Sequence, residues 1–187
     1  MQWNRDIAKA AQRAGKIIRR LAQFVRRQES VREEVLIAEV VRESIELISF
    51  EIKRNQVTIE LVPAESPLPV FIDRVQIEQV LVNLLQNAME AMAEQAPPER
   101  QITLCIEPTD DEVEVVVRDH GPGLPNGCDA SQENGTSLFA PFVSGKETGM
   151  GMGLAISNTI IQAHGGRLWA TPALPRGARF HFSLPRP

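Results

Sequence analysis

Apolar residues recur every three or four positions in four stretches of the chain, the spacing that predicts amphipathic helices. The later three stretches are residues 39–53, 74–94 and 153–163. Asn55 follows the first of these, and a Pro97–Pro98 pair closes the second, and both are stop signals for a helix. The earliest stretch runs to about residue 28, and its apolar positions form a heptad-like seam made of Trp3, Ile7, Ala11, Ala14, Ile18, Leu21 and Val25.

Alternating apolar and polar positions predict strands between and after these helices. They fall at residues 34–36, 57–61, 70–72, 102–106, 113–117, 167–171 and 178–184. A sheet covered by helices on one side is a two-layer α+β sandwich, and this is the predicted fold of residues 31–187. The helix in residues 1–30 has two interpretations, packing on its own domain or pairing outside it in a dimeric bundle, and the seam favours the second.

Composition is that of an ordinary globular chain, with 43% hydrophobic residues, 24% charged residues and a net charge of -4. Two cysteines make no disulfide framework, and no Cys/His cluster indicates zinc. The sequence has no apolar run of membrane-spanning length and no signal peptide, so we expect a cytoplasmic segment without membrane contact, whether the parent protein is soluble or membrane-anchored. No nucleic-acid partner is expected.

Charged residues and glycines are unevenly distributed along the chain. Residues 1–30 hold eight Lys/Arg and two acids, and eight of the twelve glycines lie between Gly121 and Gly153.

A polar stripe follows the predicted helix 74–94, made of Gln76, Gln79, Asn83, Asn87 and Glu90. Asn83 and Asn87 are four residues apart and therefore present two amides to one spot. An amide oxygen is a ligand suited to Mg²⁺ beside water and phosphate. The stripe taken alone is also what the solvent face of an amphipathic helix would look like.

Two later motifs are suited to a nucleotide. Asp119-His120-Gly121-Pro122-Gly123 follows a strand, and its carboxylate can accept a hydrogen bond from an exocyclic amine, although a polar turn would have the same composition. Gly149-Met150-Gly151-Met152-Gly153 opens a helix whose free N–H groups can meet phosphate, with Lys146 just upstream as a point charge. A Walker loop is excluded by Ala140 and Glu147, and a Rossmann fingerprint is excluded by Leu154.

The order of these motifs resembles the ATP-binding (Bergerat) fold shared by gyrase, the Hsp90 chaperone, sensor histidine kinases and MutL, and more narrowly the histidine-kinase catalytic domain. Four motifs over about residues 34–185 carry the resemblance. They are an N box at 83–88, a G1 box at 119–123, an F box at 138–142 and a G2 box at 149–154. Residues 87–92, with Glu90 where many of these kinases have a basic residue, look like the nitrogen-regulation and oxygen-sensing subgroup.

The resemblance implies a function and a set of sites. The function is transfer of the ATP γ-phosphate to a histidine, for onward transfer to a response regulator aspartate. Asp119 would bind the adenine amine, Asn87 would coordinate Mg²⁺, and Asn83 and Lys146 would lie by the phosphates as the catalytic pair. The full implied nucleotide set, framing a mobile lid at about 120–153, is Asn83, Asn87, Asp119, Gly121, Gly123, Lys146, Gly149, Gly151, Gly153 and Leu154.

None of the three histidines suits the role of phosphate acceptor. His120 lies within the G1 box, His164 lies at a helix end where a capping or charge–dipole role is expected, and His181 is expected to point outward from the last strand. In the family the acceptor lies on the first helix of a dimerisation hairpin, and residues 14–21 look like the second. The acceptor helix and any sensor domain are therefore expected outside this sequence, and residues 1–30 are a possible homodimer contact.

Two other functions remain as alternatives. One is a regulatory module, such as an anti-sigma-type serine kinase or a nucleotide-dependent switch, which the basic helical arm disfavours. The other is a gyrase- or MutL-type ATPase, whose members usually have a glutamate at the position of Asn83 to activate water. An amide cannot act as that base.

Overall fold

The structure is a computed structural model in which residues 31–124, 138–140 and 152–187 are described. The chain divides into two compact units, Met1–Val31 and Arg32–Pro187. The predicted helix within residues 1–30 lies outside the described residues, so the second unit is described by itself. Within the described residues no helix is both long and apolar enough to cross a membrane.

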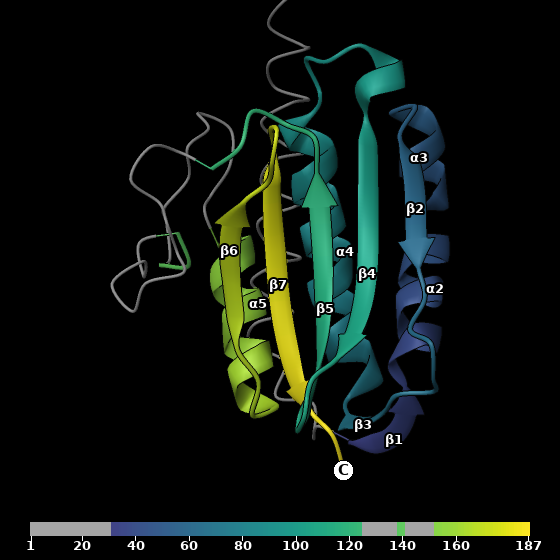
Figure 1. The fold of residues 1–187 in the computed structure, drawn as a ribbon, viewed down its shortest axis with the longest axis vertical. Helices are drawn as coiled ribbons and strands as arrows, with labels where there is room; N and C mark the ends of the chain where they lie inside the picture. Colours follow the sequence, from purple (N-terminus) through teal and green to yellow (C-terminus); the bar gives the residue numbers. More distant parts are fainter. Residues whose placement is uncertain (1–30, 125–137, 141–151) are drawn as a thin grey trace, which may run out of the picture. The chain divides into compact units, whose positions relative to one another are not determined.

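The second unit is built on a five-stranded mixed sheet with the strand order β2-β4-β5-β7-β6 (Figure 1). β2 (Thr58–Val62) runs parallel to β4 (Gln101–Pro108), and the remaining pairs are antiparallel. β5 (Glu112–Asp119) occupies the centre, between β4 and β7 (Ala178–Pro185), while β6 (Leu168–Pro172) lies at one edge. β1 (Glu33–Leu36) and β3 (Pro69–Ile72) form a separate antiparallel pair.

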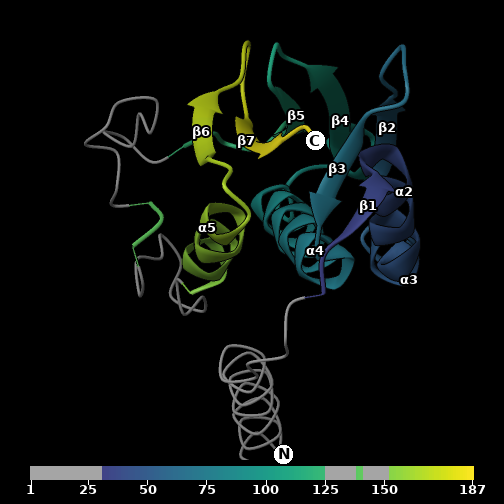
Figure 2. The same cartoon turned by 90° about the horizontal axis from the view of Figure 1, so that it is seen from below.

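Helices cover one face of this sheet, as the view from below shows (Figure 2). They are α2 (Ile37–Leu47), α3 (Ser49–Arg54), α4 (Arg74–Ala91) and α5 (Gly153–Ala163), with a short 3-10 helix η1 (Pro97–Glu99) before β4. α4 begins at its N-cap Asp73, whose carboxylate accepts from the Gln76 N–H group. α4 then packs beneath β5 and between α2 and α5, so it is the central helix of its layer.

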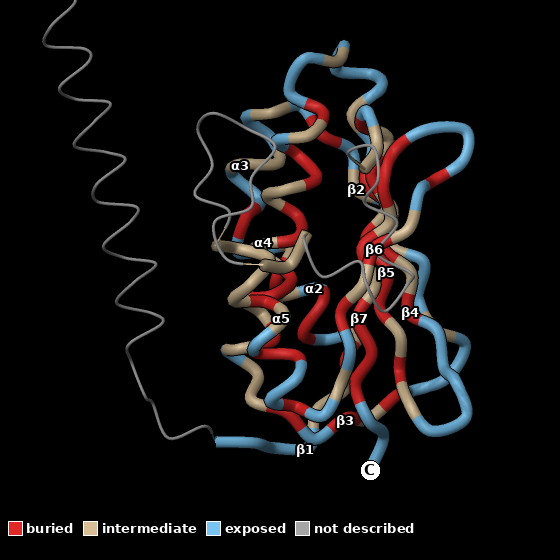
Figure 3. Tube along the Cα trace, turned by 90° about the vertical axis from the view of Figure 1, so that its left-hand side faces the viewer, coloured by how far each residue is buried: buried red, intermediate tan, exposed pale blue. Residues whose placement is uncertain are grey.

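The core lies between the two layers (Figure 3). The inward-facing residues of β5 and β7 alternate with outward-facing ones, so period-2 patterning in the sequence becomes one buried face. The largest fully buried side chains come from both layers and are Phe182, Ile37, Ile72, Ile77, Leu81, Leu84, Leu85, Met92, Ile102, Leu104, Ile161 and Leu184. The predicted two-layer α+β sandwich is therefore confirmed.

The predicted helix over 39–53 is wrong in one respect, because it is two helices. Ile48 has φ -108° and ψ 17°, which is outside the α-helical range, and it separates α2 from α3. Its side chain is buried, so the apolar face continues through the break between the two helices. Asn55 ends α3 as expected, and its side-chain amide donates to the Glu51 carbonyl.

The sheet face away from the helices carries His181, as predicted. Its Nδ1 lies 2.6 Å from Glu114 Oε1, and its Nε2 lies 2.8 Å from Thr171 Oγ1. The ring stacks on Trp169 with centroids 5.1 Å apart and planes inclined by 9°. These contacts cross-link β5, β7 and β6, which is a structural role and not that of an exposed phosphate acceptor.

Candidate functional site

Asp119 is the last residue of β5, and the residue is only 2% exposed. Oδ1 accepts a hydrogen bond from the Gly121 N–H group at 2.7 Å and from the Ala178 N–H group at 3.2 Å. A buried carboxylate is expensive unless it is hydrogen-bonded, and two backbone donors hold this one in a fixed orientation. The sequence motif therefore corresponds to a rigid acceptor at the end of a central strand.

Glycines are required where the chain passes close to this carboxylate. A Cβ on Gly121 would lie 2.8 Å from Asp119 Oδ1 and 3.2 Å from the Ala91 Cβ. Gly177 has φ +103°, and a Cβ there would lie 2.8 Å from the Asp119 carbonyl carbon and closer still to its oxygen. Gly123 also has a positive φ, +95°, and faces the Gly177 carbonyl. The end of α4, the G1 box and the β6–β7 turn therefore meet around Asp119.

Asn83 lies on α4 and contacts the start of α5. Its Nδ2 donates to the hydroxyl of Ser157 at 3.0 Å, and Ser157 is 1% exposed. A Cβ on Gly153 would lie 3.1 Å from Asn83 Cγ and closer still to its Oδ1. The structure thus brings the predicted N box and the end of the G2 box together, although they are seventy residues apart in the chain.

A strip along α4 connects these two places. Asn83 contacts α5, and Ala91, eight residues later, faces Gly121 beside Asp119. At 1.5 Å per residue the two points are about 12 Å apart. Asn87 lies between them, half-buried and one turn beyond Asn83. A carboxylate acceptor at one end and amides with a helix start at the other make an elongated polar site.

The donors available for a metal are few in the described part of the chain. No group of three His, Cys, Asp or Glu side chains could hold an ion there. A hard cation such as Mg²⁺ would therefore need an amide oxygen together with oxygens that a nucleotide brings. Asn87, in the strip between Asp119 and the α5 terminus, fits that description.

The remaining predicted residues are described only in part. Leu154 packs partly buried against the core, as do Leu124, Leu138 and Phe139. Lys146, Gly149 and Gly151 lie outside the described residues, with most of the predicted lid. Their predicted roles stay predictions.

His164, at the end of α5, has the capping role that was predicted but not the charged one. Nδ1 lies 2.8 Å from the Ile160 carbonyl, and Nε2 accepts from the Asp73 N–H group at 3.1 Å. This tautomer is neutral. Burial, and to a smaller extent the nearby Arg32 cation, lower the pKa of His164 in spite of the Ile160 carbonyl and Asp73. The imidazole therefore joins the end of α5 to the N-cap of α4 without using the helix dipole.

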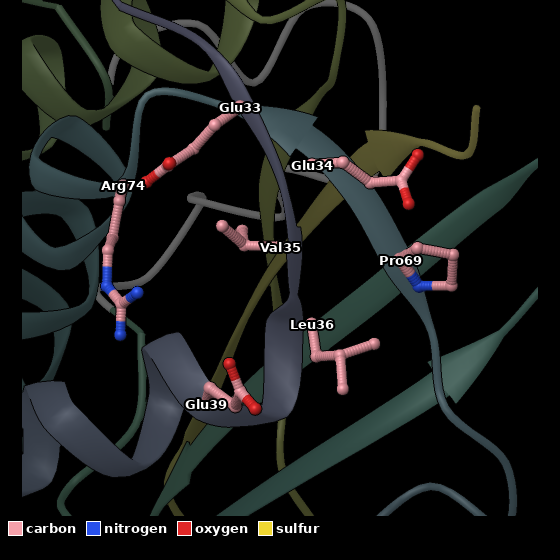
Figure 4. Close-up of a pocket in the computed structure, with 7 residues that line it drawn as sticks. All are labelled: Glu33, Glu34, Val35, Leu36, Glu39, Pro69 and Arg74. Carbon is pink, nitrogen blue, oxygen red and sulfur yellow. The ribbon is translucent and has the colours of Figure 1, made fainter.

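A separate hollow of about 360 Å³ lies at β1, β3 and the starts of α2 and α4 (Figure 4). Its charged lining is Glu33, Glu34, Glu39 and Arg74, and the Arg74 guanidinium is already bonded to Glu43 at 2.8 Å. Three carboxylates would repel a triphosphate. The hollow is also at the opposite end of the sheet from Asp119 (Figure 1), so the predicted site residues do not line it. It is not the nucleotide site.

Three contributors to the polar site were not found from the sequence. Ser157 follows the predicted G2 box on α5, and Gln95 and Gly177 lie in loops that show no chemical motif. Their roles depend on contacts between distant segments.

Known proteins resemble this chain over most of its length. The sensor protein FixL of Bradyrhizobium diazoefficiens is 41% identical over 181 residues, which are 95% of this chain and 34% of FixL. The sensor protein TdiS of Thauera aromatica is 35% identical over 174 residues, 92% of this chain and 31% of TdiS. The chain thus spans about a third of the length of these relatives.

Solved structures give the same result for the fold. The catalytic domain of histidine kinase ThkA, in a nucleotide-free form, superposes with a TM-score of 0.71 at 31% identity, covering 83% of this chain and 96% of that domain. ThkA in complex with the response regulator protein TrrA matches with a TM-score of 0.75 at 27% identity, over 97% of this chain and 49% of that one. Residues 72–187 match the family described as histidine kinase-, DNA gyrase B-, and HSP90-like ATPase. This chain therefore belongs to that ATPase family, and its described unit has the fold of a histidine-kinase catalytic domain.

Proposed function

We propose that this chain is the ATP-binding catalytic part of a two-component sensor histidine kinase, with the adenine amine bound by Asp119. The supporting observation is the Asp119 carboxylate, buried and held by the Gly121 and Ala178 N–H groups. A fixed acceptor in a dry site discriminates strongly for a ligand that carries the matching donor. FixL, TdiS and ThkA, each named as a sensor or a histidine kinase, support the same assignment.

The phosphates lie toward the start of α5. The N–H groups around Gly153 point out of the helix, and the helix dipole favours negative charge there. Gly151 and Gly149 extend this backbone surface, and Lys146 adds a point charge. Asn83 orients the phosphate end from α4. Asn87 is the side chain that would hold Mg²⁺, and the ion would supply positive charge against the phosphates.

The product of the reaction is phosphohistidine and not free phosphate. Asn83 is an amide held by Ser157, so it cannot take a proton from water as a carboxylate base would. This favours transfer to an imidazole over rapid hydrolysis. The acceptor is a histidine outside this chain, because His120, His164 and His181 are engaged in contacts within the described unit.

The partners follow from the same assignment. They are a phosphoacceptor helix, a response regulator receiver domain and a second copy of the chain paired through the seam in residues 1–30. The solved complex of histidine kinase ThkA with the response regulator protein TrrA supports the receiver domain as a partner class.

Phosphotransfer tests the proposal directly. Incubated alone with Mg²⁺ and radiolabelled ATP, the chain should acquire no acid-labile label. A helical fragment that carries an acceptor histidine should become labelled at a rate that rises with its concentration, since the two are not covalently joined. Label on His120 or His164 of the isolated chain, removed by substitution to Gln, would contradict the external acceptor.

A second experiment tests the metal. Asn87→Leu should lose the Mg²⁺ dependence of ATP binding because it removes the amide oxygen, whereas Asn87→Asp keeps an oxygen ligand and should retain it. The exposed Gln162→Leu is a matched control. Full Mg²⁺ dependence in Asn87→Leu would remove Asn87 from the site.

A further inference from the structure

We propose that Gln95 is a positioning residue that sets the adenine selectivity of Asp119. This inference rests on the proposed ATP site and adds a residue from a segment without any recognised motif, the loop between α4 and η1. The Gln95 side chain donates from Nε2 to the His120 carbonyl at 2.8 Å. His120 separates Asp119 from Gly121, so the bond acts on the peptide unit at the centre of the turn that carries the carboxylate.

Gln95 is itself fixed by Arg100. The Arg100 guanidinium donates to three backbone carbonyls, those of Gln95 at 3.0 Å, Asn55 at 2.7 Å and Ala93 at 3.0 Å. These bonds tie the loop after α4 to the end of α3 and to the start of β4. Because Arg100 fixes the backbone at Gln95, the Gln95 side-chain amide can hold the turn in place.

The bond to His120 explains the orientation of the Gln95 amide, which leaves the amide oxygen without a hydrogen bond from the described residues. Its Oε1 is buried and has no hydrogen-bond partner among the described residues. Rotating the amide would place that oxygen against the His120 carbonyl, which cannot donate. Buried polar atoms are almost always paired, so an unpaired one indicates that the opposite end of the amide is constrained.

A second loop holds the other side of the same turn. Gly177 lies against the Asp119 carbonyl, and the Ala178 N–H group donates to Oδ1. The two loops are joined to each other, because Arg176 Nη2 lies 2.6 Å from Glu99 Oε2. That pair is about half exposed and contributes little by itself. The partly buried bond from Gln95 therefore adds a constraint on this flank, beside the one between the His120 ring and the Gln101 carbonyl.

The consequence is selectivity as well as affinity. A 6-aminopurine presents a donor to Asp119, whereas the 6-oxopurine of inosine triphosphate presents an acceptor. Discrimination requires the carboxylate to stay where the amine will be, since a turn that can move adapts to either base. Losing the Gln95 bond should weaken ATP binding about tenfold, in line with an unpaired, partly buried carbonyl, and should weaken inosine triphosphate binding much less.

The experiment compares ATP with inosine triphosphate by calorimetry on the whole chain, in the wild type and in three variants. Gln95→Leu removes the donor. Gln95→Glu keeps the shape but cannot donate when ionised, and it serves if the leucine variant folds poorly. Gln162→Leu makes the same replacement at an exposed position on α5. The ratio of the two affinities should fall about tenfold in both Gln95 variants and stay at the wild-type value in Gln162→Leu.

If Gln95 had a purely structural role, its substitution would weaken the binding of both nucleotides equally or lower only the melting temperature. An unchanged ratio in folded Gln95→Glu, or an equal loss for both nucleotides, overturns the role of Gln95 and leaves the ATP site intact. Absence of ATP binding by the wild type overturns the site and the inference together.

Discussion

Gly153→Ala should damage nucleotide binding while leaving the fold nearly as stable as before. Gly153 is the first residue of α5 and carries no positive φ, so alanine suits its backbone. The new Cβ would lie 3.1 Å from Asn83 Cγ and closer still to Oδ1. Since ordinary carbon contacts are roughly 3.5–4.0 Å, the Asn83 amide has to move by about 1 Å.

The stability terms nearly cancel. Moving Asn83 breaks its bond to Ser157, which costs about 1 kcal/mol. Replacing glycine by alanine at the start of a helix returns up to about 1 kcal/mol. The melting temperature should therefore change by only a few degrees. A misplacement of about 1 Å in a positioned group can cost on the order of 100-fold in function, and ATP affinity should fall by tenfold or more.

Calorimetry with ATP and a thermal melt, run on the same samples, separate the two effects. Ser157→Ala is the matched control, because it removes the hydrogen bond but leaves room for Asn83. Its ATP affinity should fall less than that of Gly153→Ala. Wild-type ATP affinity in a folded Gly153→Ala would refute the contact between the N box and α5 as part of the site.

Two other predictions concern stability. Gly177→Ala should destabilise the fold by several kcal/mol, since φ +103° strains alanine and its Cβ would meet the Asp119 backbone, which cannot move aside; an unchanged denaturation midpoint would contradict this. The pKa of His164 is lowered by burial, so the unfolded chain binds a proton at a pH where the folded chain does not. Stability should therefore be full above about pH 6.5 and decline as the pH falls below it. His164→Gln should show a shallower decline in melting temperature between pH 7.5 and 5.5, and an equally steep one would exclude His164 as the cause.

The elements were largely predictable because their signals are local. The Gly153–Ala163 helix was predicted with its observed bounds, and β4 and β5 were located by alternation around a turn. What local patterns could not give is pairing. β2 lies parallel to β4 because the chain crosses over through α4, and β1 pairs with β3 although α2, α3 and β2 lie between them in the chain. Both pairings join segments that are not neighbours in sequence.

The residues of the candidate site also fall into those that local sequence predicts and those that depend on contacts with distant segments. Asp119 and the asparagines of α4 were found because carboxylate, amide and glycine spacing is a chemical signal within one segment. Ser157 and Gln95 were not, because each matters only through a partner on another element. A serine inside an apolar helix and a glutamine in a loop are common, and nothing in their local sequence marks them. His164 shows the same limit: its capping position was predictable, but its burial and neutral state were not.

The central claim is that Asp119 binds the adenine of ATP, and Asp119→Asn tests it most directly. The asparagine oxygen can still accept from the Gly121 and Ala178 N–H groups, so the turn should persist and the melting temperature should change little. Its NH₂ group replaces the second carboxylate oxygen and sets a donor against the adenine amine. Calorimetry should show at least a 100-fold loss of ATP affinity, about 2.7 kcal/mol. Wild-type ATP affinity in the folded variant would contradict the assignment.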